Sequence, residues 1–130
     1  MLSQSIINKL INEAKAVMKF SYSPYSKFGV GAALLTESEE IFVGCNVENS
    51  SFGATICAER VAVTSAVAKG HQKFKAIAVI SSSEQLCTPC GICRQVISEF
   101  SLEIPVICCK ANGEYEIFHL NELLKHSFKL

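Results

Sequence analysis

The chain has 130 residues, of which 49% are hydrophobic and 18% are charged, so it has enough apolar surface for one core and is not expected to be disordered. Its 12 basic and 12 acidic side chains cancel, and no apolar run reaches the roughly 20 residues of a membrane span, so no nucleic acid and no membrane is expected as a partner. Seven cysteines without a visible secretory signal do not fit a disulfide framework, and they predict thiols or thiolates in a cytoplasmic protein.

The hydrophobic pattern predicts helices and strands in alternation. Ser3 or Ser5 is a candidate cap for the first helix, and Gly70 is a natural end for the second. In chain order, the expected elements are a helix carrying the apolar stripe 6–18, a loop over 21–26, strands over 28–35 and 40–47, a helix over 58–69, a strand over 74–80, a helix over 89–100, strands over 104–110 and 115–118, and a short helix around 120–124. This order predicts an α/β fold formed by residues 1–130 as a single domain, with one mixed sheet.

Three cysteines are placed so that they can bind one metal ion. Cys90 and Cys93 lie three residues apart after Pro89, and positions i and i+3 of a helix share one face. Cys57 stands at the start of the other predicted helix, so three thiolates can hold a tetrahedral zinc ion and leave its fourth position open. An open position is what separates a catalytic zinc site from a structural one.

Other interpretations of a Cys-x-x-Cys pair remain open at this point, because redox sites and structural zinc ribbons share the spacing. Cys87 extends the pair to a double Cys-x-x-Cys, but an iron–sulfur run would need a further cysteine where Ile97 stands. A ribbon would need a second pair upstream, and Cys45 and Cys57 are not so spaced. A thioredoxin-type pair follows the first strand, whereas this one comes late in the chain.

Glu59, two residues after Cys57, favours a zinc deaminase over these alternatives. Zinc deaminases carry a His or Cys ligand, a glutamate two residues on that does not bind the metal, and a later Pro-Cys-x-x-Cys. The chain matches this pattern with Cys57, Glu59, Pro89, Cys90 and Cys93. Glu59 is then expected to take a proton from the attacking water and to deliver protons to a ring nitrogen of the base and afterwards to the departing amine.

Longer stretches of the chain resemble the small, homotetrameric-type cytidine deaminases. The resemblance covers roughly residues 20–128 and is carried by Tyr-Ser-Lys-Phe-Gly-Val-Gly-Ala-Ala-Leu at 25–34, Gly-Cys-Asn-Val-Glu-Asn at 44–49, Cys-Ala-Glu-Arg at 57–60 and Pro-Cys-Gly-Ile-Cys-Arg-Gln at 89–95. It implies a three-layer cytidine deaminase-like sandwich with five strands and helices on both faces, one Zn²⁺ per subunit, and a homotetramer whose sites are completed by neighbouring subunits. It also implies hydrolysis of cytidine and deoxycytidine to uridine and deoxyuridine, with release of ammonia, in pyrimidine salvage.

The resemblance further implies which residues bind the substrate. The Ala58 amide would hold the pyrimidine O2, and the Thr88 carbonyl would face the leaving amine. Asn46 and Glu48 would bind the ribose, and alternation along the predicted strand places them on one face. Phe28 would form an aromatic wall beside the nucleoside.

Two further roles concern charge and subunit contact. Zinc with three thiolates carries a net charge of −1, and helix N-termini can offset part of it. The resemblance assigns Arg60 to the same task through hydrogen bonds to the ligand sulfurs, and Arg94 is a weaker second candidate. Phe128 matches an aromatic residue that closes a neighbouring subunit's site in the family.

Some residues depart from the family pattern or have no role in it. Phe52 stands where the family often has tyrosine, and Lys125 stands where proline is common, both at positions expected in subunit contacts. Four cysteines are interpreted as buried small hydrophobic residues: Cys45, Cys87, Cys108 and Cys109.

Two other functions compete with a cytidine deaminase. One is deamination of a related aminopyrimidine nucleoside such as blasticidin S, which Asn46 and Glu48 disfavour because the pair is typical of a sugar clamp. The other is a non-catalytic zinc-binding module, which gains nothing from Glu59 or from an open coordination position.

Overall fold

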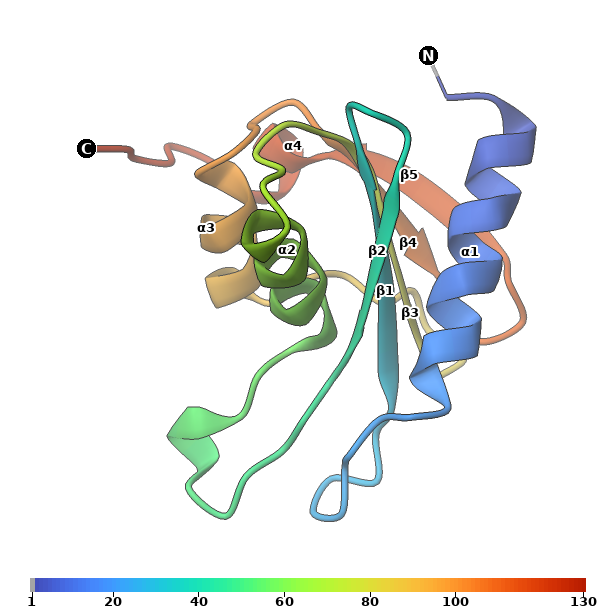
Figure 1. The fold of residues 1–130 in the computed structure, drawn as a ribbon. Coiled ribbons are helices and arrows are strands. Elements are labelled where there is room, and N and C mark those ends of the chain that lie inside the picture. The colour runs from blue at the N-terminus through green and yellow to red at the C-terminus, as the bar shows by residue number, and fades with distance from the viewer. Residues whose placement is uncertain (1) are drawn as a thin grey trace.

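A mixed sheet of five strands forms the middle layer of the protein, which a computed structural model describes over residues 2–130 (Figure 1). The strand order is β2-β1-β3-β4-β5; β3 and β4 are parallel, and the other three neighbouring pairs are antiparallel. The strands are β1 (Val30–Thr36), β2 (Ile41–Cys45), β3 (Phe74–Ser81), β4 (Pro105–Cys109) and β5 (Tyr115–His119).

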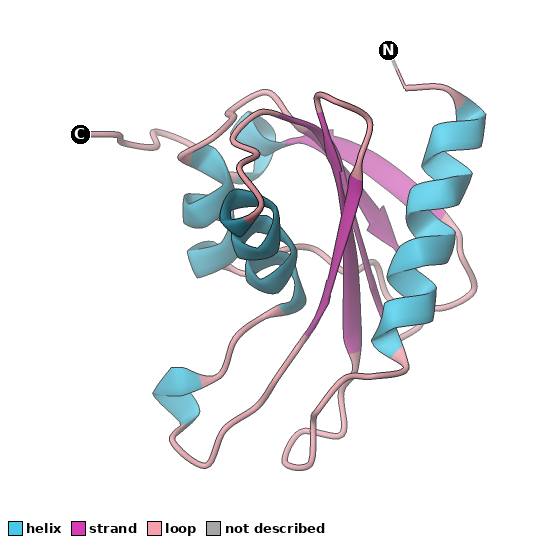
Figure 2. Ribbon diagram, in the orientation of Figure 1, coloured by secondary structure: helices cyan, strands magenta, loops and turns pink. Residues whose placement is uncertain are grey.

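Helices cover both faces of this sheet, as Figures 1 and 2 show. On one face lies α1 (Gln4–Met18), and on the other lie α2 (Ala58–Ala68), α3 (Gly91–Ser98) and the short α4 (Leu120–Leu123). A single 3-10 turn, η1 (Phe52–Ala54), sits in the long loop between β2 and α2. The predicted three-layer α/β sandwich is therefore confirmed, although the sequence pattern did not predict η1.

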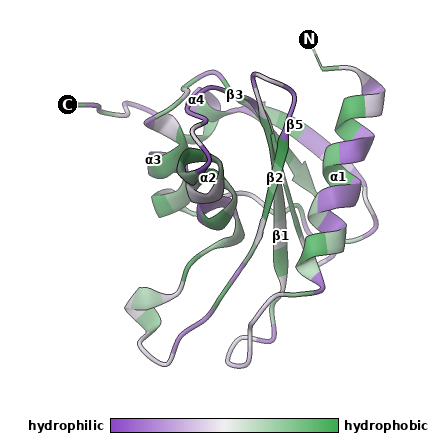
Figure 3. Cartoon of the chain, viewed as in Figure 1, coloured by the Kyte–Doolittle hydropathy of each residue, from purple (hydrophilic) through white to green (hydrophobic). Residues whose placement is uncertain are grey.

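The amphipathic stripe of α1 determines which face of the helix is buried. The Ser3 hydroxyl caps the helix by accepting a hydrogen bond from the Ile6 amide at 3.2 Å. Leu10 and Ala14 are fully buried against the sheet, while the opposite face of α1 is polar (Figure 3). Among the helices described over residues 2–130, none is long and apolar enough to cross a membrane.

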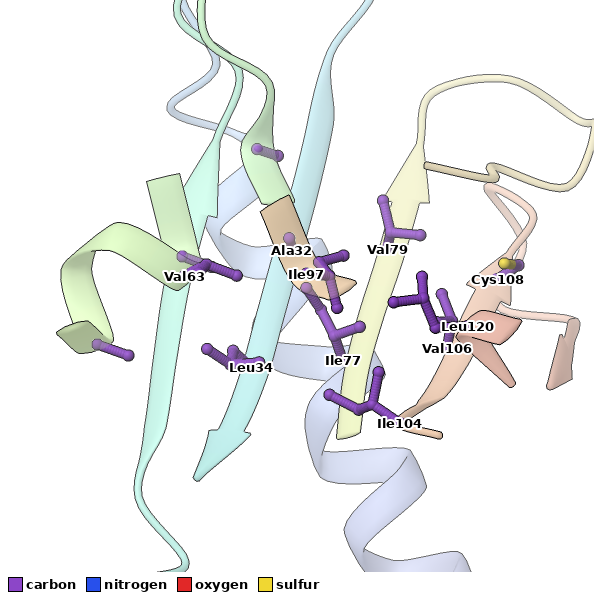
Figure 4. Close-up of a cluster of buried hydrophobic side chains, with 13 residues drawn as sticks. Ala32, Leu34, Val63, Ile77, Val79, Ile97, Ile104, Val106, Cys108 and Leu120 are labelled. Atoms are coloured by element: carbon purple, nitrogen blue, oxygen red, sulfur yellow. The ribbon is translucent and has the colours of Figure 1, made fainter. Parts of the chain in front are cut away.

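A second apolar core lies between the sheet and α2, α3 and α4 (Figure 4). Side chains from β1, β3 and β4 meet side chains from the helices there, and the core is built from Ala32, Leu34, Val63, Ile77, Val79, Ile97, Ile104, Val106, Cys108 and Leu120 among others. This packing holds the N-terminal ends of α2 and α3 in place, since both helices pack on the same sheet face.

The strand and helix boundaries differ from expectation where polar side chains intervene. β2 ends at Cys45 rather than at residue 47, because the chain leaves the sheet and Val47 makes isolated bridges to Tyr22 and Ile56. Asn46 and Glu48 therefore lie beyond the strand on which they were predicted. The helix expected from Pro89 begins at Gly91, because Cys90 is extended and forms the N-cap of α3.

Gly44 on β2 allows α2 to approach the sheet closely. A Cβ atom at this position would lie 2.4 Å from the Ala58 carbonyl oxygen and 2.6 Å from the Ala62 nitrogen. Both are backbone atoms of α2, so a side chain here cannot be accommodated by a rotamer change. The glycine thus sets the position of the first turn of α2.

Replacing Gly44 by alanine is expected to destabilise the fold by about 2 kcal/mol or more, because α2 must move away from β2. The change in the free energy of unfolding is measured by urea denaturation, from the midpoint urea concentration and the m-value. The matched control is Gly53→Ala in η1, where an added Cβ meets nothing within 4 Å and a change within about 0.5 kcal/mol is expected. Equal stabilities of the two variants would contradict the close approach.

Candidate active site

Three cysteines gather where α2 and α3 begin. Cys57 is the N-cap of α2, Cys90 is the N-cap of α3, and Cys93 lies in the first turn of α3. Their Sγ atoms all lie within 4.8 Å of one another, and those of Cys57 and Cys90 are 3.7 Å apart. The fold therefore brings together the cysteines that were predicted as metal ligands.

This cluster fits a zinc ion held by three thiolates. A tetrahedral site with Zn–S bonds of about 2.3 Å separates two sulfurs by about 3.8 Å, close to the separation of Cys57 and Cys90. Hydrogen bonds from Cys93 and then from Arg60 lower the pKa of Cys57 to about 5, which favours a thiolate. Cys93 is buried, Cys57 is half-buried and Cys90 is exposed, so the cluster is open on one side. Both helix N-termini add partial positive charge where the ligands sit.

Arg60 is the cation in contact with this cluster. Its Nη2 atom donates to the Cys57 sulfur at 3.5 Å and to the Thr55 carbonyl at 3.3 Å. Its Nε atom is buried without a hydrogen-bond partner. Arg94 is used differently, because its two hydrogen bonds go to the Pro89 and Leu123 carbonyls, each at 2.7 Å. The geometry thus agrees with the expectation for Arg60 and gives Arg94 a structural contact instead.

Glu59 lies in the first turn of α2 and is only 4% exposed. Burial raises the pKa of its carboxyl to about 7. A buried carboxyl without a lysine or arginine paired to it is costly in a structural role, and such groups gather at functional sites.

A pocket of about 420 Å³ unites Glu59 with most of the predicted substrate-binding residues. It is lined by the predicted metal ligands Cys57 and Cys90, by Glu59, and by nine further residues: Ser26, Phe28, Val30, Asn46, Glu48, Thr55, Ala58, Cys87 and Thr88. Phe128 does not line it; its side chain is 70% exposed, and its carbonyl accepts a hydrogen bond from Gln95 of α3. Phe128 therefore takes no part in the pocket of its own chain, and its predicted contact with a neighbouring subunit's site stays a prediction.

The two predicted sugar-binding residues also hold the loop before β1. Asn46 Nδ2 donates to the Phe28 carbonyl at 2.8 Å, while its Oδ1 accepts from the Val30 amide at 2.9 Å and from the Ser21 hydroxyl. Glu48 accepts from the amides of Tyr25 and Ser26 at 3.0 and 3.1 Å. The chain's own backbone therefore fixes both side chains at the rim of the pocket.

Four pocket residues were not singled out by their sequence pattern as part of the site: Ser26, Val30, Thr55 and Cys87. Ser26 stands in the motif at residues 25–34, and Cys87 stands in the double Cys-x-x-Cys. Their spacing along the chain does not indicate that they line the pocket that contains Glu59. The expectation of a buried cysteine holds for Cys108 and Cys109 and is wrong for Cys45 and Cys87, which are half-buried. For Cys87 the reason is its place in the pocket wall.

An open cluster of three thiolates with a buried glutamate beside it defines the site of a zinc-dependent deaminase. Comparison with known families agrees, since residues 4–109 match the model of the cytidine and deoxycytidylate deaminase zinc-binding region. The chain belongs to the cytidine and deoxycytidylate deaminase family, and its Cys57, Cys90 and Cys93 cluster could hold the zinc ion of that family.

Individual relatives cover between three quarters and nearly all of the chain. The cytidine deaminase of Sporosarcina psychrophila is 46% identical over 123 residues, which are 94% of this chain and 90% of that protein. The crystal structure of cytidine deaminase from Burkholderia pseudomallei superposes with a TM-score of 0.91 at 40% identity, covering 98% of this chain and all of that one. The blasticidin-S deaminase of Bacillus cereus is 31% identical over 107 residues, 76% of each chain.

Proposed function

We propose that this protein hydrolyses cytidine and deoxycytidine to uridine and deoxyuridine with release of ammonia. The observation that carries the proposal is the single pocket in which buried Glu59 and the zinc ligands meet an aromatic side chain and two sugar-binding candidates. The cytidine deaminases similar to nearly the whole chain support the same reaction.

Glu59 moves the protons of this reaction. When bound, Zn²⁺ lowers the pKa of a water molecule and so supplies a nucleophile at neutral pH. The Glu59 carboxylate takes a proton from the attacking water and passes it to N3 of the pyrimidine ring. The water oxygen bonds to C4, the C4–amine bond then breaks, and Glu59 delivers the second water proton to the departing amine. One carboxyl group therefore acts first as a base and then as an acid.

Backbone and side-chain groups around Glu59 hold the nucleoside in place. The Ala58 amide is the first of α2, so it has no partner within the helix and is available to the pyrimidine O2. The Thr88 carbonyl receives the leaving amine, and the Phe28 ring packs against the nucleoside. Asn46 and Glu48 bind the ribose, and Arg60 offsets the charge of the thiolates through Cys57.

Neighbouring subunits complete this site in a homotetramer. Support comes from Phe128, which is exposed and does not line its own chain's pocket, and from exposed aromatic side chains that line the adjoining hollow with Ser26 and Glu48. Tyr25 and Phe52 pack edge to face with ring centroids 5.7 Å apart, yet they remain 50% and 74% exposed. The seven free thiols suit a reducing cytoplasm, and free nucleosides as substrates suit pyrimidine salvage by a single-domain enzyme.

A second candidate substrate is blasticidin S, because a blasticidin-S deaminase is among the relatives. Purified protein is tested by the loss of ultraviolet absorbance with cytidine, deoxycytidine, blasticidin S, CMP and a single-stranded oligonucleotide. Cytidine and deoxycytidine are expected to react, and the nucleotide and oligonucleotide are expected to remain unchanged. Turnover of blasticidin S alone would replace the proposed substrate, and a zinc-loaded protein inert to all five would indicate a non-catalytic module.

A further inference from the structure

Ser26 connects two of the residues that line the pocket. Its hydroxyl accepts a hydrogen bond from the Phe28 amide at 3.0 Å and donates one to Glu48 Oε2. Accepting from Phe28 orients the hydroxyl, so that its own proton is directed toward Glu48. Ser26 also lines the pocket beside both residues.

The loop around Ser26 contains a closed turn. Lys27 has a positive φ of 59°, a left-handed conformation that non-glycine residues seldom adopt. The Lys27 amide donates to the Ser23 carbonyl at 3.0 Å and closes the turn. This turn places the Ser26 amide, the Tyr25 amide and the Ser26 hydroxyl around one carboxylate.

These three donors determine how many hydrogen-bond acceptor positions of Glu48 remain free for substrate. A carboxylate has about four acceptor positions, and the loop uses two on Oε1 and one on Oε2. The hydroxyl of Ser26 is also the largest influence that lowers the pKa of Glu48, so it favours the charged acceptor. What remains is a fixed acceptor on Oε2, suited to one hydroxyl group.

We infer that Ser26 is a positioning residue that orients the Glu48 carboxylate toward the sugar hydroxyls of the nucleoside. Ser26 acts through Glu48 and takes no part in the proton transfer. The inference rests on the proposed function, and it predicts that removal of the hydroxyl weakens recognition of the sugar and leaves the chemistry at the base intact.

The test compares Ser26→Ala with wild type on cytidine and on 2′,3′-dideoxycytidine, which lacks both ring hydroxyls. For cytidine, KM is expected to rise about fivefold with kcat changed less than about twofold, as suits one partly exposed hydrogen bond to a charged group. For the dideoxynucleoside, KM is expected to change less than about twofold. Ser26→Thr keeps the hydroxyl and is expected to restore most of the loss.

Three further readouts separate positioning from other roles. Bound zinc is expected to be the same in all variants, and Ser51→Ala, at an exposed serine without a cap hydrogen bond, serves as the matched control with wild-type KM. In a Glu48→Ala background, Ser26→Ala is expected to add less than about twofold. A further fivefold loss there would mean that Ser26 binds substrate directly and would overturn the inference.

An equal rise in the KM of Ser26→Ala for cytidine and for the dideoxynucleoside would also overturn the inference. Ser26 would then only support the loop and would not orient Glu48 toward the sugar. If the wild type deaminates neither nucleoside, the proposed function itself fails and the inference with it. If the wild type is active and Ser26→Ala matches it on cytidine, the positioning role fails alone.

Discussion

Replacing Glu59 by glutamine is expected to lower kcat on cytidine by at least about a thousandfold, because an amide of the same shape cannot take and return a proton. Glu59 is buried in the pocket beside the zinc ligands, and no other carboxylate lines the pocket except Glu48 at its rim. The variant is expected to keep one zinc ion per chain, because Glu59 is not among the clustered sulfur ligands. Steady-state kinetics and metal analysis of the same preparation check both statements.

The matched control is Glu13→Gln on the exposed side of α1, which is expected to have wild-type kcat and zinc content. A Glu59→Gln protein that keeps a tenth or more of wild-type turnover would show that another group moves the proton. Loss of zinc from this variant would show instead that Glu59 supports the metal, and the assignment of roles would be wrong.

Replacing Cys90 by serine is expected to abolish both zinc binding and turnover, whereas Cys87→Ser is expected to retain one zinc ion per chain. A serine hydroxyl does not ionise at neutral pH and is a poor zinc ligand compared with a thiolate. Cys90 is within 3.7 Å of the Cys57 sulfur, while Cys87 lies in the pocket wall and outside the sulfur cluster. Burial raises the pKa of Cys87 to about 12, which keeps it a neutral thiol.

Metal analysis of the two purified variants distinguishes these cysteines directly. Zinc bound to Cys90→Ser and lost from Cys87→Ser would mean that the metal is held by a different part of the double Cys-x-x-Cys. Circular dichroism on both variants shows whether the fold is retained, and this matters because Cys87 packs against the apolar core that α2 and α3 share with the sheet.

The layers of the fold were predictable from local patterns, and the ends of its strands were not. The apolar stripe of α1 and the continuous apolar run of β3 indicate which residues are buried, so residue spacing alone predicts this helix and this strand. β2 stops early because Asn46 bonds to the backbone of Phe28 and Val30, which lie sixteen or more residues away. Spacing along the chain carries no signal for such a long-range contact.

The residues of the site also divide into those set by local spacing and those set by long-range contacts. Cys57, Glu59, Cys90 and Cys93 were predictable because all four lie at two helix starts, where short spacings determine geometry. Ser26 was missed because its role depends on a turn with a left-handed Lys27 that brings it to Glu48.

Reconstitution of the metal-free protein tests the central claim most directly. Zinc is removed with a chelator and added back in steps, while uridine and ammonia are measured from cytidine. The account predicts no turnover without zinc, and activity that rises in proportion to zinc and reaches its limit at one ion per chain, with one ammonia per uridine. A chain that holds one zinc ion on Cys57, Cys90 and Cys93 and leaves cytidine unchanged would contradict it.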